Sequence, residues 1–272
     1  MVPAIIAAAA AVIAAIWLFA VFPGRPDKNK KAPFDGLNIA HRGLYDNGAG
    51  VPENSLAAFE KAAAHGYGIE LDVQLSRDGE VVVFHDDTLG RVCSENARVD
   101  ELDMSELSSL ALCGGPERIP AFSRVLELVG GRVPLLVELK HGRRDKELCE
   151  KTLELLRGYK GVYCIESFDP RIVGFFRKSA PDIMRGQLSQ PASEFKKFGF
   201  SFPANVILGH LLLNFIARPE FISYRIGKKP FPVRFAERCG AMRFGWTSID
   251  ESAEKDFDSV IFEHYRPRVR FR

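Results

Sequence analysis

Apolar and polar positions alternate along most of the chain in a pattern that is typical of repeated strand–helix units. From residue 37 onward, short apolar runs predict strands at Leu37–His41, Gly68–Leu75, Glu80–Phe84, Pro134–Lys140, Val162–Ser167, Ile183–Leu188, Phe221–Tyr224, Met242–Thr247 and Ser259–Phe262. Longer stretches with one apolar face predict helices at Ser55–His65, Asp145–Arg157 and Pro170–Ser179. Repeats of this size indicate an α/β fold with a parallel sheet, either closed into a barrel or left open.

The start of the chain departs from this pattern, because Ala4 to Phe22 carries no charge. As a helix that rises about 1.5 Å per residue, this stretch is about 28 Å long, close to the hydrocarbon thickness of a bilayer. A cleavable signal peptide carries Lys or Arg before its apolar run, whereas here the basic residues follow it, at Arg25, Lys28, Lys30 and Lys31. We therefore expect residues 1–31 to form a membrane anchor with a basic linker, and residues 32–272 to form one barrel domain.

The same basic residues predict the orientation of the anchor. The positive-inside rule places them in the cytoplasm, so we expect a single-pass protein of the inner membrane whose barrel domain is cytoplasmic. A signal peptide that sends the domain out of the cell is the alternative. A second basic cluster lies at residues 266–272, and both basic ends can hold the domain against anionic lipid.

Composition excludes several classes of protein. With 46% apolar residues, 26% charged residues and 16 prolines, the chain is neither disordered nor collagen-like. A net charge of +2 excludes a strongly basic nucleic-acid binder. The 5 cysteines are scattered without a CxxC pair, so we expect free thiols in place of a zinc site or a disulfide scaffold.

Polar side chains interrupt the predicted strands near their C-terminal ends. His41 and Arg42 end the first strand, and Glu70 and Asp72 lie in the second. The next three strands end with His85, with Glu138 and Lys140, and with Ser167. Because the C-terminal ends of the strands in a βα barrel converge on one mouth, we expect a functional site there.

The dipeptide Asp78-Gly79 predicts a hairpin turn that places Asp72 opposite His85. Side chains alternate along a strand, so Glu70 and Asp72 project from one face, with His85 beside them. A local hairpin does not fit strict βα alternation. We therefore expect an irregular barrel at this point.

These residue types suit phosphate chemistry. Glu70, Asp72 and Glu138 supply three carboxylates, whose mutual repulsion favours a bound hard cation such as Mg²⁺ or Ca²⁺, with Mn²⁺ as a further candidate. Separate pairing of each carboxylate with Arg or Lys is the alternative. Beside such an ion, Arg42 and Lys140 can bind the oxygens of a phosphate ester.

Two histidines complete this group. Cleavage of a phosphodiester needs a base for the nucleophile and an acid for the leaving alkoxide, and His41 and His85 can fill these roles. The remaining histidines lack this context and are interpreted as structural or solvated: His65, His141, His210 and His264.

The run from Ile39 to Cys93, which contains IAHRG, PENS, GIELDVQ and FHDDTLG, resembles the N-terminal signature of the glycerophosphodiester phosphodiesterases. IPAFSRVLELV, LLVELK, CIESFDP and FGWTSID continue the match, which covers roughly residues 37–263. The resemblance implies an irregular TIM-like (β/α)8 barrel that hydrolyses glycerophosphodiesters to an alcohol and glycerol 3-phosphate with a divalent cation. It further implies an acid–base pair, two phosphate contacts and three metal ligands, which are respectively His41 and His85, Arg42 and Lys140, and Glu70, Asp72 and Glu138.

Three further residues carry open interpretations. Glu53, in the Pro-Glu-Asn element, matches a family position at the mouth, where it is a ligand or a partner of the ligands; alternatively it serves the start of the following helix. Trp246 is expected to form a wall for the glycerol or the leaving group, with core packing as the alternative. Glu263 stands where many members have an aspartate, so its contribution to the mouth is open.

Other functions also remain open at this point. The alternatives are another metal-dependent barrel phosphodiesterase, such as a phosphoinositide- or sphingolipid-cleaving phospholipase, and a non-enzymatic binding barrel. The anchor adds lipid-derived diesters such as lysophospholipids to the small-molecule substrates that fit this site. Val206 to Ile216 is apolar but too short to span a bilayer, and we expect a buried helix, or else a lip that touches lipid.

Overall fold

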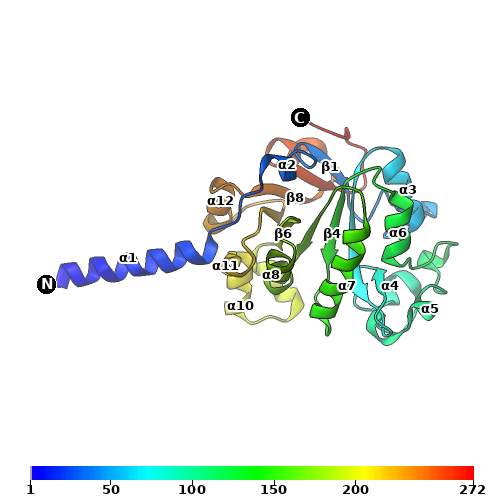
Figure 1. Cartoon of the computed structure of the whole chain (residues 1–272), viewed down its shortest axis with the longest axis horizontal. Coiled ribbons are helices and arrows are strands. Elements are labelled where there is room, and N and C mark those ends of the chain that lie inside the picture. The colour runs from blue at the N-terminus through cyan, green and yellow to red at the C-terminus, as the bar shows by residue number, and fades with distance from the viewer. Residues whose placement is uncertain (1) are drawn as a thin grey trace.

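The computed structural model describes residues 2–272 and contains a closed barrel of parallel strands that is surrounded by helices (Figure 1). The barrel strands, in chain order, are β1 Leu37–Ala40, β2 Gly68–Leu75, β4 Leu135–Leu139, β5 Tyr163–Ser167, β6 Met184–Ser189, β7 Phe221–Arg225, β8 Met242–Ser248 and β9 Ser259–Phe262. Strand β1 pairs in parallel with both β2 and β9, and these two ladders close the ring. The predicted TIM-like barrel is confirmed.

Helices cover the outer face of the barrel. In chain order after the N-terminal helix α1 (Val2–Val21), they are α2 Lys28–Lys31, α3 Leu56–Ala64, α4 Gly90–Cys93, α5 Met104–Leu107, α6 Phe122–Val129, α7 Asp145–Gly158, α8 Pro170–Ser179, α9 Ala192–Phe195, α10 Phe202–Gly209, α11 Asn214–Ala217 and α12 Phe231–Arg238. Short 3-10 turns lie at Asn47–Ala49, Val99–Glu101, Leu112–Gly114, Lys196–Phe198 and Glu251–Lys255. Most predicted elements agree with these bounds within two residues.

Alternating side chains divide each strand between two environments. On β4, Leu135 and Val137 face the helices, whereas Leu136 and Glu138 face the barrel axis. The half of the interior at the N-terminal ends of the strands is filled by an apolar cluster, in which the rings of Phe221 and Phe244 stack 4.2 Å apart. The charged side chains of the interior therefore lie in its other half, at the C-terminal ends of the strands.

The hairpin between β2 and β3 (Val81–Val83) corrects one prediction. The ladder pairs Val73 with Val83, so the expected two-residue turn and the pairing of Asp72 with His85 are both wrong. The loop is longer because the Ser76 hydroxyl accepts a hydrogen bond from the backbone N–H of Glu80 at 2.9 Å. His85 consequently lies just past the ladder.

The apolar segment before β7 also differs from its prediction. It forms two short helices, α10 and α11, and leaves several apolar side chains half-buried, so the expected single buried helix is wrong. Gly209 ends α10 where its backbone approaches Ala192 so closely that a Cβ atom would lie 2.8 Å from the nitrogen. Leu211 then takes a positive φ of 58°, which turns the chain.

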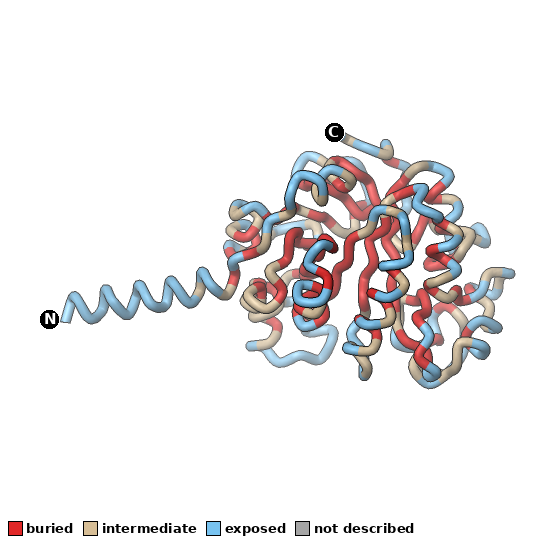
Figure 2. Tube along the Cα trace, in the orientation of Figure 1, coloured by how far each residue is buried: buried red, intermediate tan, exposed pale blue. Residues whose placement is uncertain are grey.

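Helix α1 projects from the barrel and is exposed along nearly its whole length (Figures 1 and 2). It is long and apolar enough to cross a membrane, a property that it shares with signal sequences. Only its base contacts the barrel: Arg218 donates a hydrogen bond to the carbonyl of Phe19 at 3.1 Å, and Asn214 donates one to that of Val21 at 2.9 Å. The Trp17 ring stacks 5.7 Å from that of Phe231.

The end of the barrel opposite the mouth is tied together by Asp258. Its carboxylate accepts hydrogen bonds from the backbone N–H and the guanidinium of Arg243, and from Arg272 at 3.0 Å. Burial alone would raise the pKa of Asp258, but these two arginines outweigh it and lower the pKa from 3.8 to about 2. The ionised carboxylate thus links β8, β9 and the C-terminal tail.

We predict that Asp258→Asn lowers the free energy of unfolding by about 2 kcal/mol at pH 7, because it removes charge-assisted hydrogen bonds. The folded-state pKa is depressed, so the contribution is complete above about pH 4 and is lost as the pH falls toward about 2. Chemical denaturation of the full chain across this pH range measures the effect. The exposed Asp256→Asn is the matched control, and a variant as stable as that control at pH 7 would contradict the prediction.

Candidate active site

Three carboxylates from two neighbouring strands meet inside the barrel, near the C-terminal ends of the strands. Asp72 on β2 is in register with Glu138 on β4, and Glu70 lies two positions earlier on the same face as Asp72. All three residues are buried, and each offers an oxygen such that the three oxygens lie within 4.8 Å of one another. The structure therefore brings together the three expected ligand residues.

The electrostatics of this cluster fit a hard cation. Burial, followed by repulsion from Asp72 and Glu138, raises the pKa of Glu70 well above its usual value. The Oδ1 atom of Asp72 is buried and accepts no hydrogen bond. Because Mg²⁺, Ca²⁺ and Mn²⁺ favour carboxylate oxygens, the donor set suits such an ion.

Lysine and arginine side chains surround the cluster. The Nζ atom of Lys140 lies 2.8 Å from Glu138 and 3.4 Å from Asp72, and Nε of Arg42 lies 3.6 Å from Asp72. Burial would raise the pKa of Asp72, but the charges of His85, Lys140 and Arg42 outweigh it and hold that pKa well below its usual range. His85 therefore lies near Asp72, although the hairpin register that predicted this was wrong.

Arg42 is fixed at both its backbone and its side chain. Its N–H donates to Glu70 at 2.7 Å from a left-handed conformation (φ 53°), and its guanidinium donates to Glu53 at 2.6 Å. Glu53 also accepts two hydrogen bonds of 2.7 Å from Arg91. Burial is outweighed by these two arginines, which lower the pKa of Glu53 to about 2. The Glu53 carboxylate is thus occupied with holding Arg42.

Each of the two histidines contacts a carboxylate through Nδ1. His41 Nδ1 lies 2.9 Å from Glu263, which also accepts a hydrogen bond from Tyr45 at 3.0 Å. His85 Nδ1 lies 2.6 Å from Asp86. Burial favours the neutral ring and lowers the pKa of His41 despite the opposing hydrogen bond with Glu263. Glu263 therefore does reach the mouth.

A polar cavity of about 840 Å³ opens at the mouth beside His41 and Arg42. Tyr45, Arg91 and Glu263 also line it. On the other side of the mouth, Trp246 is half-buried and donates a hydrogen bond from its indole N–H to the carbonyl of Ser223 at 3.3 Å. Its ring meets the ring of Phe168 edge-on at 5.8 Å.

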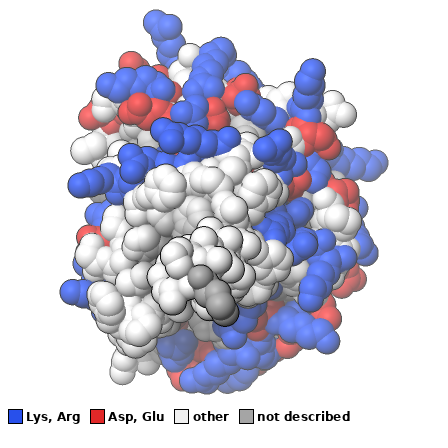
Figure 3. All heavy atoms as spheres, turned by 90° about the vertical axis from the view of Figure 1, so that its left-hand side faces the viewer, with Lys and Arg blue, Asp and Glu red and all other residues white. Residues whose placement is uncertain are grey.

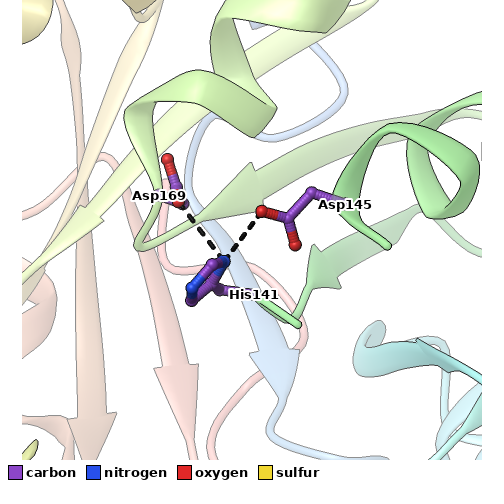
Figure 4. A group of neighbouring side chains, drawn as sticks. All are labelled: His141, Asp145 and Asp169. Carbon is purple, nitrogen blue, oxygen red and sulfur yellow. Dashed lines mark hydrogen bonds and ion pairs between the residues drawn. The ribbon is translucent and has the colours of Figure 1, made fainter. Parts of the chain in front are cut away.

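A second group of metal-type ligands lies outside this site. His141 contacts Asp145 at 2.8 Å and Asp169 at 3.5 Å (Figure 4). Arg171 pairs with Asp169 at 2.5 Å and approaches Asp145 at 3.8 Å, so a cation already lies between the two carboxylates. This group is an ion-pair network that joins the starts of α7 and α8, in agreement with the structural or solvated role expected for His141.

Sequence reasoning missed several residues of the site. Asp86 follows His85 directly, so its adjacency was a usable signal, whereas the role of Arg91 depends on how its loop folds back. Glu166 on β5 is in register with Glu138 and is fully buried, and burial together with the Glu138 charge raises its pKa well above the usual value. The alternation that located Glu138 would also have located Glu166.

Known proteins with similar sequences include phosphodiesterases. Residues 41–259 match the glycerophosphoryl diester phosphodiesterase family. A glycerophosphodiester phosphodiesterase of Caldanaerobacter subterraneus subsp. tengcongensis is 36% identical over 57% of this chain and 67% of its own length. A putative glycerophosphodiester phosphodiesterase of Bacillus subtilis is 33% identical over 65% of this chain and 77% of its own length.

Solved structures agree at the level of the fold. A phosphodiesterase of Oleispira antarctica, in complex with the product sn-glycerol-3-phosphate, superposes with a TM-score of 0.67 at 24% identity, over 84% of this chain and 93% of its own. The family match covers most of the barrel and includes the strands that carry the acidic cluster. The chain therefore belongs to the glycerophosphoryl diester phosphodiesterase family and is a phosphoric diester hydrolase.

Proposed function

We propose that this protein hydrolyses glycerophosphodiesters to an alcohol and a glycerol phosphate, with a divalent cation held by Glu70, Asp72 and Glu138. The observation that carries the proposal is the close approach of these three buried carboxylates, whose oxygens lie within 4.8 Å of one another. Mg²⁺ and Ca²⁺ suit this oxygen set, and Mn²⁺ is a further candidate. When bound, the ion supplies charge neutralisation at the phosphate and lowers the pKa of an attacking hydroxyl.

The chain's own cations orient the phosphate. Arg42 and Lys140 are the phosphate contacts, because both are half-buried at the mouth and both keep their positive charge next to the carboxylates. A guanidinium can donate two parallel hydrogen bonds to phosphate oxygens. Glu53 positions Arg42 for this task and is not itself a ligand, since Arg42 and Arg91 already occupy its carboxylate.

His41 and His85 transfer the protons. Glu263 and Asp86 each fix one ring through Nδ1, which leaves Nε2 of each histidine to take a proton from the attacking hydroxyl or to give one to the leaving alkoxide. His41 is suited to the role of base, because burial lowers its pKa and favours the neutral ring. Trp246 forms a wall for the glycerol part of the substrate.

The same proposal includes the placement of the enzyme. Residues 1–31 form an anchor and linker of the inner membrane, and residues 32–272 form the catalytic barrel on its cytoplasmic side. The apolar length of α1 and the basic residues that follow it support this topology. Labelling from each side of an inverted membrane vesicle tests the cytoplasmic placement against export of the domain.

We predict that Glu70→Ala and His85→Ala each lower kcat by a factor of about 10² or more, because they remove a metal ligand and a proton-transfer group. The measurement is the release of choline from glycerophosphocholine. His65→Ala, at an exposed helix end, is the control and keeps normal activity. Near-normal turnover in either site variant would refute the assigned site.

Removal of divalent ions with EDTA is expected to abolish hydrolysis, because the three carboxylates then repel one another and leave the phosphate charge uncompensated. Titration of the stripped enzyme with Mg²⁺, Ca²⁺ or Mn²⁺ in turn should restore turnover with at least one of them. Full activity in EDTA after exhaustive dialysis would exclude metal dependence.

Glu263→Ala is expected to lower kcat by about 10- to 100-fold with little change in KM, because the His41 ring loses the partner that orients it. The exposed Glu251→Ala is the matched control and is expected to leave both constants unchanged. An unchanged kcat in Glu263→Ala would show that His41 needs no such orientation.

A further inference from the structure

An apolar cavity of about 290 Å³ opens beside the mouth and shares no lining residue with the polar cavity. Its walls come from the loop after β5 and from the segment between α9 and α11, namely Phe168, Phe195, Phe200, Leu208, Leu213 and Ile216. Its volume is close to that of small-molecule sites, which begin at about 300 Å³. A small, fully polar diester has no apolar part that this cavity would bind.

The cavity adjoins the catalytic mouth through one row of aromatic side chains. Phe168 directly follows the last residue of β5, and its ring contacts Phe195 at 5.9 Å on one side and Trp246 at 5.8 Å on the other. His141, at the edge of the cavity, is the neighbour of Lys140, whose Nζ lies 2.8 Å from Glu138. An unbroken row of aromatic rings thus leads from the wall of the mouth into the cavity.

The cavity also adjoins the base of the anchor. Leu208, Leu213 and Ile216 lie on α10, α11 and the turn between them, and this same segment holds α1 through Asn214 and Arg218. The face around α1 is largely uncharged, and Lys and Arg side chains border it (Figure 3). An apolar face with a basic border is the surface expected of a domain that rests on an anionic bilayer.

We propose that the apolar cavity binds the hydrocarbon chain of a glycerophosphodiester that keeps one acyl chain and that reaches the mouth from the bilayer; this inference rests on the proposed function. The chain enters past Phe168, the glycerol lies against Trp246, and the head-group alcohol occupies the polar cavity. Water adds to phosphorus and the P–O bond to the head-group alcohol breaks, so the products are the acylated glycerol phosphate and the free alcohol.

The lining of the cavity is better suited to bind a hydrocarbon chain than a polar ligand. The charged residues at its edge, Asp169 and Arg171, are paired with each other at 2.5 Å and leave the interior apolar. Binding of a chain by such walls strengthens with the apolar area that is removed from water. Phe200 in the cavity wall and Phe202 outside it are both exposed, and they place apolar surface where a lipid would enter.

The test compares two substrates for the full chain in bilayer nanodiscs: 1-palmitoyl-lysophosphatidylcholine, which has a chain, and glycerophosphocholine, which has none. Phe200→Ser removes an aromatic ring from the lining of the cavity, and Leu213→Trp places a larger side chain in it. Each is expected to lower the ratio of kcat/KM values, lipid over soluble substrate, by about tenfold or more. Hydrolysis of glycerophosphocholine is expected to stay within about twofold of wild type, which also reports that the variants are folded.

Phe202→Ser is the matched control, because Phe202 is 73% exposed on the same face but does not line the cavity. The ratio is expected to be unchanged in this variant. An unchanged ratio in both cavity variants would overturn the inference, and so would an equal loss in Phe202→Ser, which would assign the effect to contact with the bilayer. A wild-type chain that hydrolyses only glycerophosphocholine overturns the inference alone, whereas one that hydrolyses neither substrate refutes the proposed function as well.

Discussion

Repulsion between buried carboxylates is the constraint on which the rest of this barrel depends. Glu70, Asp72 and Glu138 lie close together away from water, and burial of an uncompensated charge costs far more than a surface ion pair returns. The chain compensates in part with Arg42 and Lys140. In the proposed mechanism, a divalent cation compensates the remaining negative charge and prepares the site to bind a phosphate.

The surrounding residues can be understood as support for those charges. Glu53 is held by two arginines and holds Arg42 in turn, so the proposed phosphate contact is fixed before any substrate arrives. Glu263 and Asp86 do the same for the two imidazoles. Prior orientation of this kind spares the reaction the cost of arranging its groups in the transition state. The apolar cluster around Phe221 and Phe244 fills the opposite half of the barrel interior and keeps water from that side of the site.

Much of the fold and part of the site could be predicted from the sequence, because both follow from local periodicity. Alternation along β2 and β4 located Glu70, Asp72 and Glu138, and the family resemblance implied that they are metal ligands. The hairpin register could not be predicted, since the hydrogen bond between Ser76 and Glu80 that lengthens the loop leaves no trace in the apolar pattern. The contact between His41 and Glu263 joins positions 222 residues apart and exists only once the barrel closes.

The anchor and the apolar cavity extend the same account to the membrane. One short segment, α10 and α11, both contacts the base of α1 and lines the cavity beside the mouth. In the proposed topology, this segment therefore sets the position of the bilayer together with the approach to the site. A barrel that hung from a flexible tether would lack this fixed relation. In the proposed complex, the polar and apolar cavities hold the two ends of one lipid.

The most direct test of the central claim is a count of bound ions by electron paramagnetic resonance with Mn²⁺ on the full chain. The account predicts one tightly bound ion per wild-type chain and loss of that ion in Asp72→Asn, which keeps the shape of the side chain and removes its charge. An ion that stays bound in Asp72→Asn, or a wild-type chain that binds none, would contradict it.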